Sequence, residues 1–341
     1  MMFIQDESQL DDRLSEPTRE VVETIARASG DFAVLGVGGK MGPTLARMLR
    51  RALDAAGSRS RVFGISRFSS PTAREELHRH GIETIACDLL DESAVADLPE
   101  APNVVSMTGR KFGSTGDEAT TWAMNAYMPA VVCRKFRRSR IVAFSTGNVY
   151  GLTSVDSAGS RETDALQPVG EYAMSALARE RMFEYFSREL AIPMAIIRLN
   201  YACELRYGVL VDIAQRIRSG APVDLDIGHF NALWQGDANA MALRAFDHIA
   251  TPLWTVNVAG PEHLSVRSVA TRLGELMKRP IEFRGSEGPT ALLSDARMGF
   301  ERLGRPRVAA DTLIEWVADW VSRGGRCLDK PTHFESREGR F

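Results

Sequence analysis

Short apolar runs alternate with longer amphipathic stretches along the first 200 residues of the chain. A short apolar run bounded by turn residues is typical of a buried strand, whereas apolar positions that recur every three to four residues are typical of a helix. Parallel strands need crossover connections, which helices usually supply, so this alternation predicts a parallel sheet. The expected strands are residues 32–35, 61–65, 83–87, 103–107, 140–144 and 193–197, and the expected helices are residues 43–56, 72–80, a short one near 93, 119–136 and 170–188.

The rest of the chain predicts a smaller lobe. Beyond residue 200 the pattern indicates helices at 209–219, 266–278 and 310–321 and a strand at 253–258. The predicted fold class is α/β, a Rossmann-like doubly wound parallel sheet with a smaller C-terminal substrate lobe. The expected divisions are an N-terminal helical extension (1–30), the Rossmann domain (31–200), a mainly substrate-binding lobe (201–329) and an irregular tail (330–341).

Three glycines lie where the first expected strand turns into the first helix, spaced G-x-x-G-x-x-G between residues 36 and 42. Glycine permits a tight turn, lets a pyrophosphate approach the backbone and allows the helix to pack closely on the strand. The start of the helix adds unpaired N–H groups and partial positive charge. The sequence therefore predicts a dinucleotide-binding loop. Its expected cofactor contacts are Gly36, Gly39, Lys40, Met41 and Gly42.

The end of the second expected strand bears on the choice of cofactor. An acidic residue there would accept hydrogen bonds from the adenosine ribose and favour NAD. The chain has Ser66 and Arg67 instead. A hydroxyl beside a permanently charged guanidinium suits a 2′-phosphate, so NADP is preferred over NAD, unless Arg67 is an ordinary surface residue. Asp88, after the third strand, either reaches the adenine amino group or caps a turn.

Composition and charge exclude several other classes of protein. The formal net charge of -2 gives no field that would attract nucleic acid. The four cysteines are far apart and include no C-x-x-C pair, so we expect no metal site and no disulfide framework. No apolar stretch approaches the ~18 residues of a membrane span, and the acidic start is unlike a secretory signal. We expect a cytoplasmic protein with no membrane partner.

Several segments, in order, resemble the extended short-chain dehydrogenase/reductase family, the NAD-dependent epimerase/dehydratase group. The glycine loop and the segment FSTGNVYG at residues 144–151 are the most specific of them. The resemblance extends over about residues 32–320. The other resembling segments are 87–89 (CDL), 168–172 (PVGEY), 198–201 (RLNY) and 256–262 (VNVAGPE).

The resemblance implies a catalytic pair. Thr146 would hydrogen-bond the substrate oxygen, with Ser145 beside it, and Tyr172 would exchange a proton with that oxygen as hydride moves to or from the nicotinamide. Met107, Leu89 and Lys111 complete the expected cofactor contacts. The family carries a lysine four residues after the tyrosine, which holds the nicotinamide ribose and supplies positive charge. This chain has Ala176 there.

Three interpretations of Ala176 stay open. A free tyrosine has a pKa of about 10 and is a poor base without a nearby cation. Another cation could replace the lysine, and Arg110 and Lys111, in the loop after the fourth expected strand, are the candidates. Alternatively, Tyr172 acts only as a neutral donor or the proton takes another route. In the third interpretation the protein binds NADP(H) without turnover, as a sensor or a partner subunit.

The resemblance also points to the substrate. We expect an NAD(P)-dependent oxidoreductase or epimerase/dehydratase that acts on a hydroxyl or carbonyl of a sugar or sugar-derived molecule. The family's Tyr-Gly-Pro continuation after Asn200 is absent, so a small polyol, sugar or sugar acid fits the chain as well as a nucleotide diphosphate does. A homodimer built through residues 119–136 and 170–188 is implied as well. The expected substrate contacts are Asn148, Arg198, Asn200 and Arg206, with His229 as a further candidate.

Overall fold

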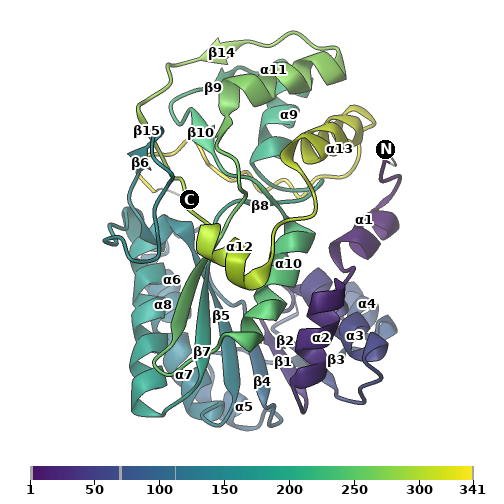
Figure 1. Ribbon diagram of the computed structural model, residues 1–341, viewed down its shortest axis with the longest axis vertical. Helices are drawn as coiled ribbons and strands as arrows, with labels where there is room; N and C mark the ends of the chain where they lie inside the picture. Colours follow the sequence, from purple (N-terminus) through teal and green to yellow (C-terminus); the bar gives the residue numbers. More distant parts are fainter. Residues whose placement is uncertain (1–2, 69–70, 112, 340–341) are drawn as a thin grey trace.

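The computed structural model describes residues 3–68, 71–111 and 113–339. Its centre is a seven-stranded sheet in which all neighbouring strands are parallel, in the order β12-β7-β5-β4-β1-β2-β3 (Figure 1). The predicted α/β, Rossmann-like fold is confirmed. The strands are β1 (Phe32–Leu35), β2 (Val62–Ser66), β3 (Glu83–Ala86), β4 (Asn103–Ser106), β5 (Arg140–Thr146), β7 (Met194–Leu199) and β12 (Trp254–Val258).

Each face of the sheet has its own apolar layer, because successive side chains of a strand point to opposite faces. In β1, Phe32 and Val34 pack with helices α2, α3 and α10, whereas Ala33 and Leu35 pack with α5, α7 and α8. The helices on the first face are α2 (Arg19–Arg27), α3 (Gly42–Ala55) and α10 (Gln235–Arg244), and those on the second are α5 (Glu92–Ala96), α7 (Met128–Lys135) and α8 (Gly170–Glu189).

A smaller lobe lies above the carboxyl ends of the strands (Figure 1). Its core is formed by three helices that contact one another, α9 (Val209–Ser219), α11 (Val266–Met277) and α13 (Ala310–Ser322). Among the described residues, four two-stranded sheets join segments within the lobe or join the lobe to the sheet domain. These pairs are β8 (Ala202–Cys203) with β11 (Leu233–Trp234), β9 (Val223–Asp224) with β14 (Phe283–Arg284), β10 (His229–Phe230) with β13 (Leu264–Ser265), and β6 (Thr153–Ser154) with β15 (Thr290–Ala291).

Two elements differ from the sequence-based expectation. The strand expected in the lobe at 253–258 is β12, which pairs with β7 and covers what would otherwise be an exposed sheet edge. The helix expected at 119–136 is divided into α6 (Glu118–Trp122), a π-helical turn over Ala123–Tyr127 and α7. Pro129, at the start of α7, has no N–H to donate, which interrupts the regular helical ladder there.

Three further α-helices lie in the described part of the chain. They are α1 (Glu7–Leu14), α4 (Pro71–Arg79) and α12 (Arg297–Leu303). No helix in the described part of the chain is long and apolar enough to span a bilayer. Within the same residues, no group of three or more His, Cys, Asp or Glu side chains could hold a metal ion.

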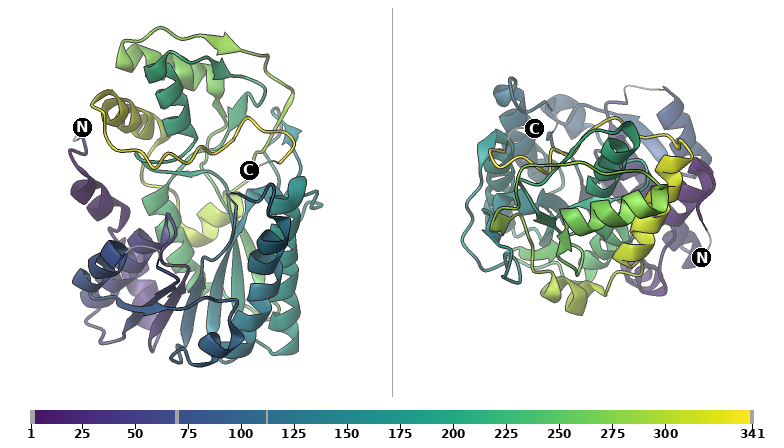
Figure 2. Two further views of the ribbon diagram at one scale, coloured as in Figure 1. Left: turned by 180° about the vertical axis from the view of Figure 1, so that it is seen from behind. Right: turned by 90° about the horizontal axis from the view of Figure 1, so that it is seen from above.

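The C-terminal tail is irregular but packed. After α13 it crosses the molecule between the lobe and the sheet domain (Figure 2). Thr332 is 2% exposed and Phe334 4%, and Phe334 packs against Phe230 of the lobe. The tail then reaches the first turn of α8, where a Cβ on Gly170 would lie 2.5 Å from the carbonyl oxygen of Gly339. The tail therefore links the lobe to the helix that carries Tyr172.

Candidate functional site

The glycine loop follows β1 at the point where the sheet order changes direction. β1 is flanked by β2 on one side and β4 on the other, which is the switch point where α/β sheets bind ligands. Gly36 has a φ of +81°, and a Cβ there would lie 2.8 Å from Oγ1 of Thr108. Only glycine fits this backbone without strain.

The start of α3 suits a pyrophosphate. Its N-cap residue, Met41, makes no side-chain capping hydrogen bond, and Pro43 follows at the start of the helix. A Cβ on Gly42 would lie 2.3 Å from the carbonyl oxygen of Val37, so the loop and helix are in backbone contact. The first N–H groups of a helix have no partner within it, so the residues present fit a dinucleotide.

A cavity of about 420 Å³ opens beside the loop, and we call it the outer pocket. It brings together seven of the residues expected to contact the cofactor. Arg67 and Asp88 lie 3.9 Å apart in its rim, and the Arg67 side chain is 69% exposed. Asp88 accepts a hydrogen bond from the backbone of Leu90, whereas the cap of α5 is Asp91. The seven residues are Gly36, Gly39, Ser66, Arg67, Asp88, Leu89 and Met107.

A second cavity of about 170 Å³, the inner pocket, lies between the sheet edge and the lobe. It contains both members of the expected catalytic pair. Thr146 ends β5 and donates a hydrogen bond to Oδ1 of Asn148 at 2.9 Å, while Tyr172 lies in the first turn of α8. The expected site residues in its wall are Lys40, Met41, Lys111, Ser145, Thr146, Asn148, Tyr172 and Asn200.

Of the two candidate replacement cations, the structure places only Lys111 at this pocket. Its Nζ lies 5.8 Å from the ring centroid of Tyr172 and 3.4 Å from the carbonyl oxygen of Thr332. Arg110 instead forms an ion pair with Asp117 at 2.8 Å and donates to the backbone of Gly113. The Arg110 side chain is therefore held in its own loop.

Ala176, at the position of the absent lysine, is fully buried against Val149 and Tyr150. One turn further along α8, Arg179 is also buried and donates to the carbonyl oxygen of Phe144 at 3.1 Å. Its guanidinium lies against Gly109 of the outer pocket, where a Cβ would be 2.3 Å from Nη2. Burial lowers the pKa of Arg179, while the nearby Tyr172 hydroxyl raises it. Sequence reasoning missed this cation because it falls outside the expected spacing.

Arg198 lies beneath the inner pocket rather than in its wall. It is 5% exposed and pairs with Glu180 at 2.7 Å, and it also donates to the hydroxyl of Tyr150 at 2.8 Å. Glu180 additionally accepts a hydrogen bond from Oγ of Ser145 at 2.5 Å. These bonds raise the pKa of Arg198 despite burial, which alone would lower it. The expected substrate contact by Arg198 is thus replaced by a supporting role under Ser145.

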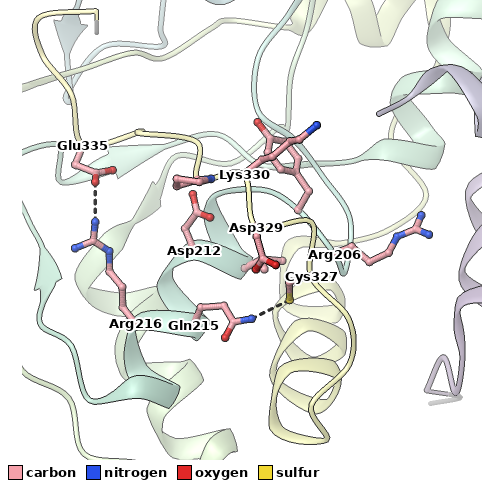
Figure 3. Close-up of a pocket in the computed structure, with 11 residues that line it drawn as sticks. Arg206, Asp212, Gln215, Arg216, Cys327, Asp329, Lys330 and Glu335 are labelled. Carbon is pink, nitrogen blue, oxygen red and sulfur yellow. Dashed lines mark hydrogen bonds and ion pairs between the residues drawn. The ribbon is translucent and has the colours of Figure 1, made fainter. Parts of the chain in front are cut away.

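Arg206 belongs to a different cavity, of about 240 Å³, between α9 and the tail (Figure 3). Figure 3 shows its side chain directed away from that cavity, toward the N-terminal helix. There it pairs with Asp11 at 2.8 Å and Glu7 at 3.3 Å, and with the buried Glu204 at 3.1 Å. His229 lies in β10 and does not line the inner pocket. The structure therefore does not bring Arg206 or His229 to Tyr172.

Among the residues of the inner pocket that were not expected as site residues, three illustrate what was missed. Tyr207 lies just before α9, and burial raises the pKa of its hydroxyl. Gln235 begins α10 and donates to Oγ1 of Thr44 at 3.2 Å. Thr332 comes from the tail, and its hydroxyl donates to Asp212 at 2.6 Å. Tyr207 and Gln235 were not part of a motif used to predict the site. The tail has no hydrophobic periodicity from which the position of Thr332 could be predicted.

Comparisons with solved structures agree with this architecture. UDP-glucose 4-epimerase from Thermotoga maritima, solved with UDP-glucose, has a TM-score of 0.72 at 18% identity and covers 86% of this chain and 99% of its own. UDP-glucuronic acid 4-epimerase from Bacillus cereus, solved with UDP-glucuronic acid and NAD, has a TM-score of 0.70 at 16% identity over 86% and 99%. A putative epimerase from Burkholderia cenocepacia has a TM-score of 0.66 at 20% identity over 88% and 100%. These likenesses establish the fold.

Sequence comparison is more specific. None of the curated proteins matches the chain. The model of the NAD dependent epimerase/dehydratase family matches residues 32–206, which is just over half of the 341 residues and includes the glycine loop, Thr146 and Tyr172. The chain therefore belongs to the NAD dependent epimerase/dehydratase family.

Proposed function

We propose that this protein is an NAD(P)-dependent oxidoreductase or epimerase that acts on a hydroxyl or carbonyl of a small sugar-derived substrate. One observation carries the proposal: Thr146 and Tyr172 share the inner pocket with Lys40 and Met41 of the glycine loop. Two hydroxyl groups and the end of a dinucleotide-binding loop thus face the same space.

The proposed chemistry uses these two hydroxyls in different ways. Thr146 holds the substrate oxygen by a hydrogen bond, and Tyr172 exchanges a proton with it. A bound nicotinamide would supply the hydride transfer. Lys111 places its Nζ 5.8 Å from the ring centroid of Tyr172, in the same pocket. Lys111 therefore supports the interpretation in which another cation replaces the lysine missing at Ala176.

NADP is the proposed cofactor. Ser66 and Arg67 both line the outer pocket, and the guanidinium of Arg67 is accessible to a 2′-phosphate. Asp88, 3.9 Å away, holds the same side chain at the rim but does not bury it. An accessible arginine that pairs only at this distance can turn to a phosphate at little cost.

The substrate we propose is smaller than the nucleotide sugars named with the solved relatives. Ligand pockets for drug-sized molecules are typically about 300–1,000 Å³. The inner pocket has about 170 Å³ and is closed on one side by Thr332 of the tail. This volume favours a compact sugar or sugar acid.

We also propose a homodimer. Large apolar side chains that are exposed gather on the helical layer formed by α6, the π-helical turn and α8, which a second copy of the chain would cover. Light scattering measures the assembly state directly. The exposed residues are Trp122, Tyr127, Met174 and Tyr185.

The central test separates cofactor binding from turnover. Fluorescence titration with NADPH and NADH comes first, followed by assays of NADPH oxidation against small ketoses, aldoses and sugar acids. Tyr172→Phe is expected to keep cofactor affinity and to lose roughly 100-fold or more in turnover, since proton transfer by a positioned side chain contributes about 10²–10⁴-fold.

Tyr185→Phe is the matched control, because it removes the hydroxyl of a tyrosine that is 55% exposed on the same helix and keeps the ring that the proposed dimer would cover. Binding of NADPH without turnover of any substrate would favour the non-catalytic sensor or partner subunit. Failure to bind either dinucleotide would end both interpretations.

A further inference from the structure

Two lysines from separate loops reach the inner pocket. Lys40 belongs to the glycine loop and Lys111 follows β4, and both line the cavity that contains Thr146 and Tyr172. The Nζ of Lys40 lies 3.2 Å from the ring centroid of Tyr207, which comes from the lobe on the opposite side. The ammonium groups thus lie between the sheet domain and the lobe, beside the proposed catalytic pair.

Burial disfavours the charged forms of both lysines, and neighbouring cations further disfavour that of Lys40. Burial, and then the charges of Lys111 and Lys330, lower the pKa of Lys40 to about 6, against opposing effects of Asp212 and Glu204. Burial lowers the pKa of Lys111 to about 8, and Asp212 opposes this shift. An anion that enters a pocket lined by these two lysines favours their charged forms and gains electrostatic energy from them.

Two carboxylates near Lys40, those of Asp212 and Glu204, make bonds to other residues. Asp212 accepts hydrogen bonds from the N–H of Thr332 at 2.8 Å and from its hydroxyl at 2.6 Å. Glu204 is paired with Arg206 at 3.1 Å. Both carboxylates are therefore held on the lobe and the tail by bonds of their own.

Resting on the function proposed above, we propose that the inner pocket selects a substrate bearing a small oxyanion, a carboxylate or a phosphate, and that Lys111 and Lys40 receive its negative charge. The pyrophosphate of the dinucleotide is a less suitable partner. The backbone of Gly36, Gly38 and Gly39 lines the outer pocket, whereas the two lysine side chains line the inner one. The charge thus lies on the side of Tyr172, where the reacting group of the substrate would be held.

The test uses the full chain saturated with NADP and isothermal titration calorimetry. The probes are D-glucuronate as the carboxylate, D-glucose 6-phosphate as the phosphate and D-glucose as the neutral molecule. We expect at least one acidic probe to bind roughly tenfold or more tightly than D-glucose, because charge-assisted hydrogen bonds are the stronger ones. Comparison of D-glucuronate with D-glucose 6-phosphate shows whether the pocket prefers a carboxylate or a phosphate.

Lys111→Met is expected to remove this preference, and Lys278→Met is the control. Lys278 is exposed at the end of α11, so its substitution changes the net charge equally without touching the pocket. Equal binding of acidic and neutral probes, unchanged acid binding in Lys111→Met, or no acid binding at all would overturn the proposal. Loss of NADP binding in the unmodified protein would instead overturn the function on which it rests.

Proton uptake gives a second readout. At neutral pH most of Lys40 is uncharged before an anion binds, and a bound anion favours its protonated form. Titrations in buffers with different ionisation heats should show uptake of about one proton per acid bound. The groups facing Lys40 in the described part of the chain include Lys111, Lys330, Asp212, Glu204 and Tyr207. Uptake that persists in Lys40→Met would contradict the assignment of Lys40.

Discussion

The outer and inner pockets are built in different ways. The outer pocket is formed by loops that directly follow β1, β2, β3 and β4, so its wall is set by the sheet itself. The inner pocket also takes residues from the lobe and the tail, including Tyr207 and Thr332. Its chemistry therefore depends on how distant parts of the chain pack together.

Because of this difference, we expect the outer pocket to be the more rigid of the two and the inner pocket to determine substrate selectivity. Backbone contacts at Gly36 and Gly42 leave the outer pocket little freedom, as expected for a site that holds one common cofactor. The inner pocket combines two lysines, two catalytic hydroxyls and a buried ion pair below them. Small changes in the lobe or tail can alter it without disturbing the cofactor site.

The largest effect is expected beneath the inner pocket. Arg198→Met leaves the carboxylate of Glu180 buried without its partner, and breaking a buried pair in this way costs about 3–5 kcal/mol of unfolding free energy. Urea denaturation measures the loss. Arg188→Met is the control, because Arg188 forms an exposed pair with Glu184 that is worth about 0.3–0.5 kcal/mol.

If the Arg198→Met variant is stable but binds substrate weakly, Arg198 contacts the substrate and does not merely support the pocket. This outcome would also remove the distinction between the residues that line the inner pocket and those that support it.

A smaller effect is expected in the outer pocket. An added Cβ at Gly42 would meet the backbone of Val37 at 2.3 Å, so the backbone would have to shift. Overpacking of this kind costs about 1–3 kcal/mol. Gly42→Ala should therefore weaken NADPH binding by roughly 10- to 100-fold in a fluorescence titration. Gly151→Ala is the control, because an added Cβ there first meets the side chain of Gln167 at 3.2 Å and Gly151 lines neither pocket. Equal losses in both variants would show that the close contact at Gly42 is unimportant.

The smallest effect concerns the rim of the outer pocket. Arg67→Gln removes the proposed partner of the 2′-phosphate and should lower the preference for NADPH over NADH by roughly tenfold, which corresponds to about 1.4 kcal/mol. The ratio of the two dissociation constants is the measurement. Arg59→Gln, an exposed arginine before β2, controls for net charge. An unchanged ratio would identify Arg67 as a surface residue.

Local signals made most of the sheet domain predictable. The strand, glycine loop and helix from residue 32 to 55 follow from short-range rules, and the amphipathic stretch at 170–188 closely matches α8. The outer pocket was predictable for the same reason. Its expected cofactor contacts lie at or just after the ends of strands β1 to β4. Parallel strands end at one edge of the sheet, so these loops meet without further information.

The inner pocket was only partly predictable. Thr146, Tyr172 and Asn200 were placed by motif, but the difference between Lys111 and Arg110 depends on Asp117, which holds the arginine in its loop. Arg198 was assigned to substrate because its motif gives no sign of Glu180, 18 residues away, as a buried partner. Long-range pairing of charges leaves no periodic trace in the sequence.

The tail has a kinetic consequence for the inner pocket. Lys111 of the sheet domain donates to the carbonyl oxygen of Thr332, and Asp212 of the lobe accepts from its N–H and hydroxyl, so one residue is fastened from both sides. The inner pocket can widen on this side only when these three bonds open. We therefore expect exchange of ligands bulkier than the pocket to be limited by release of the tail.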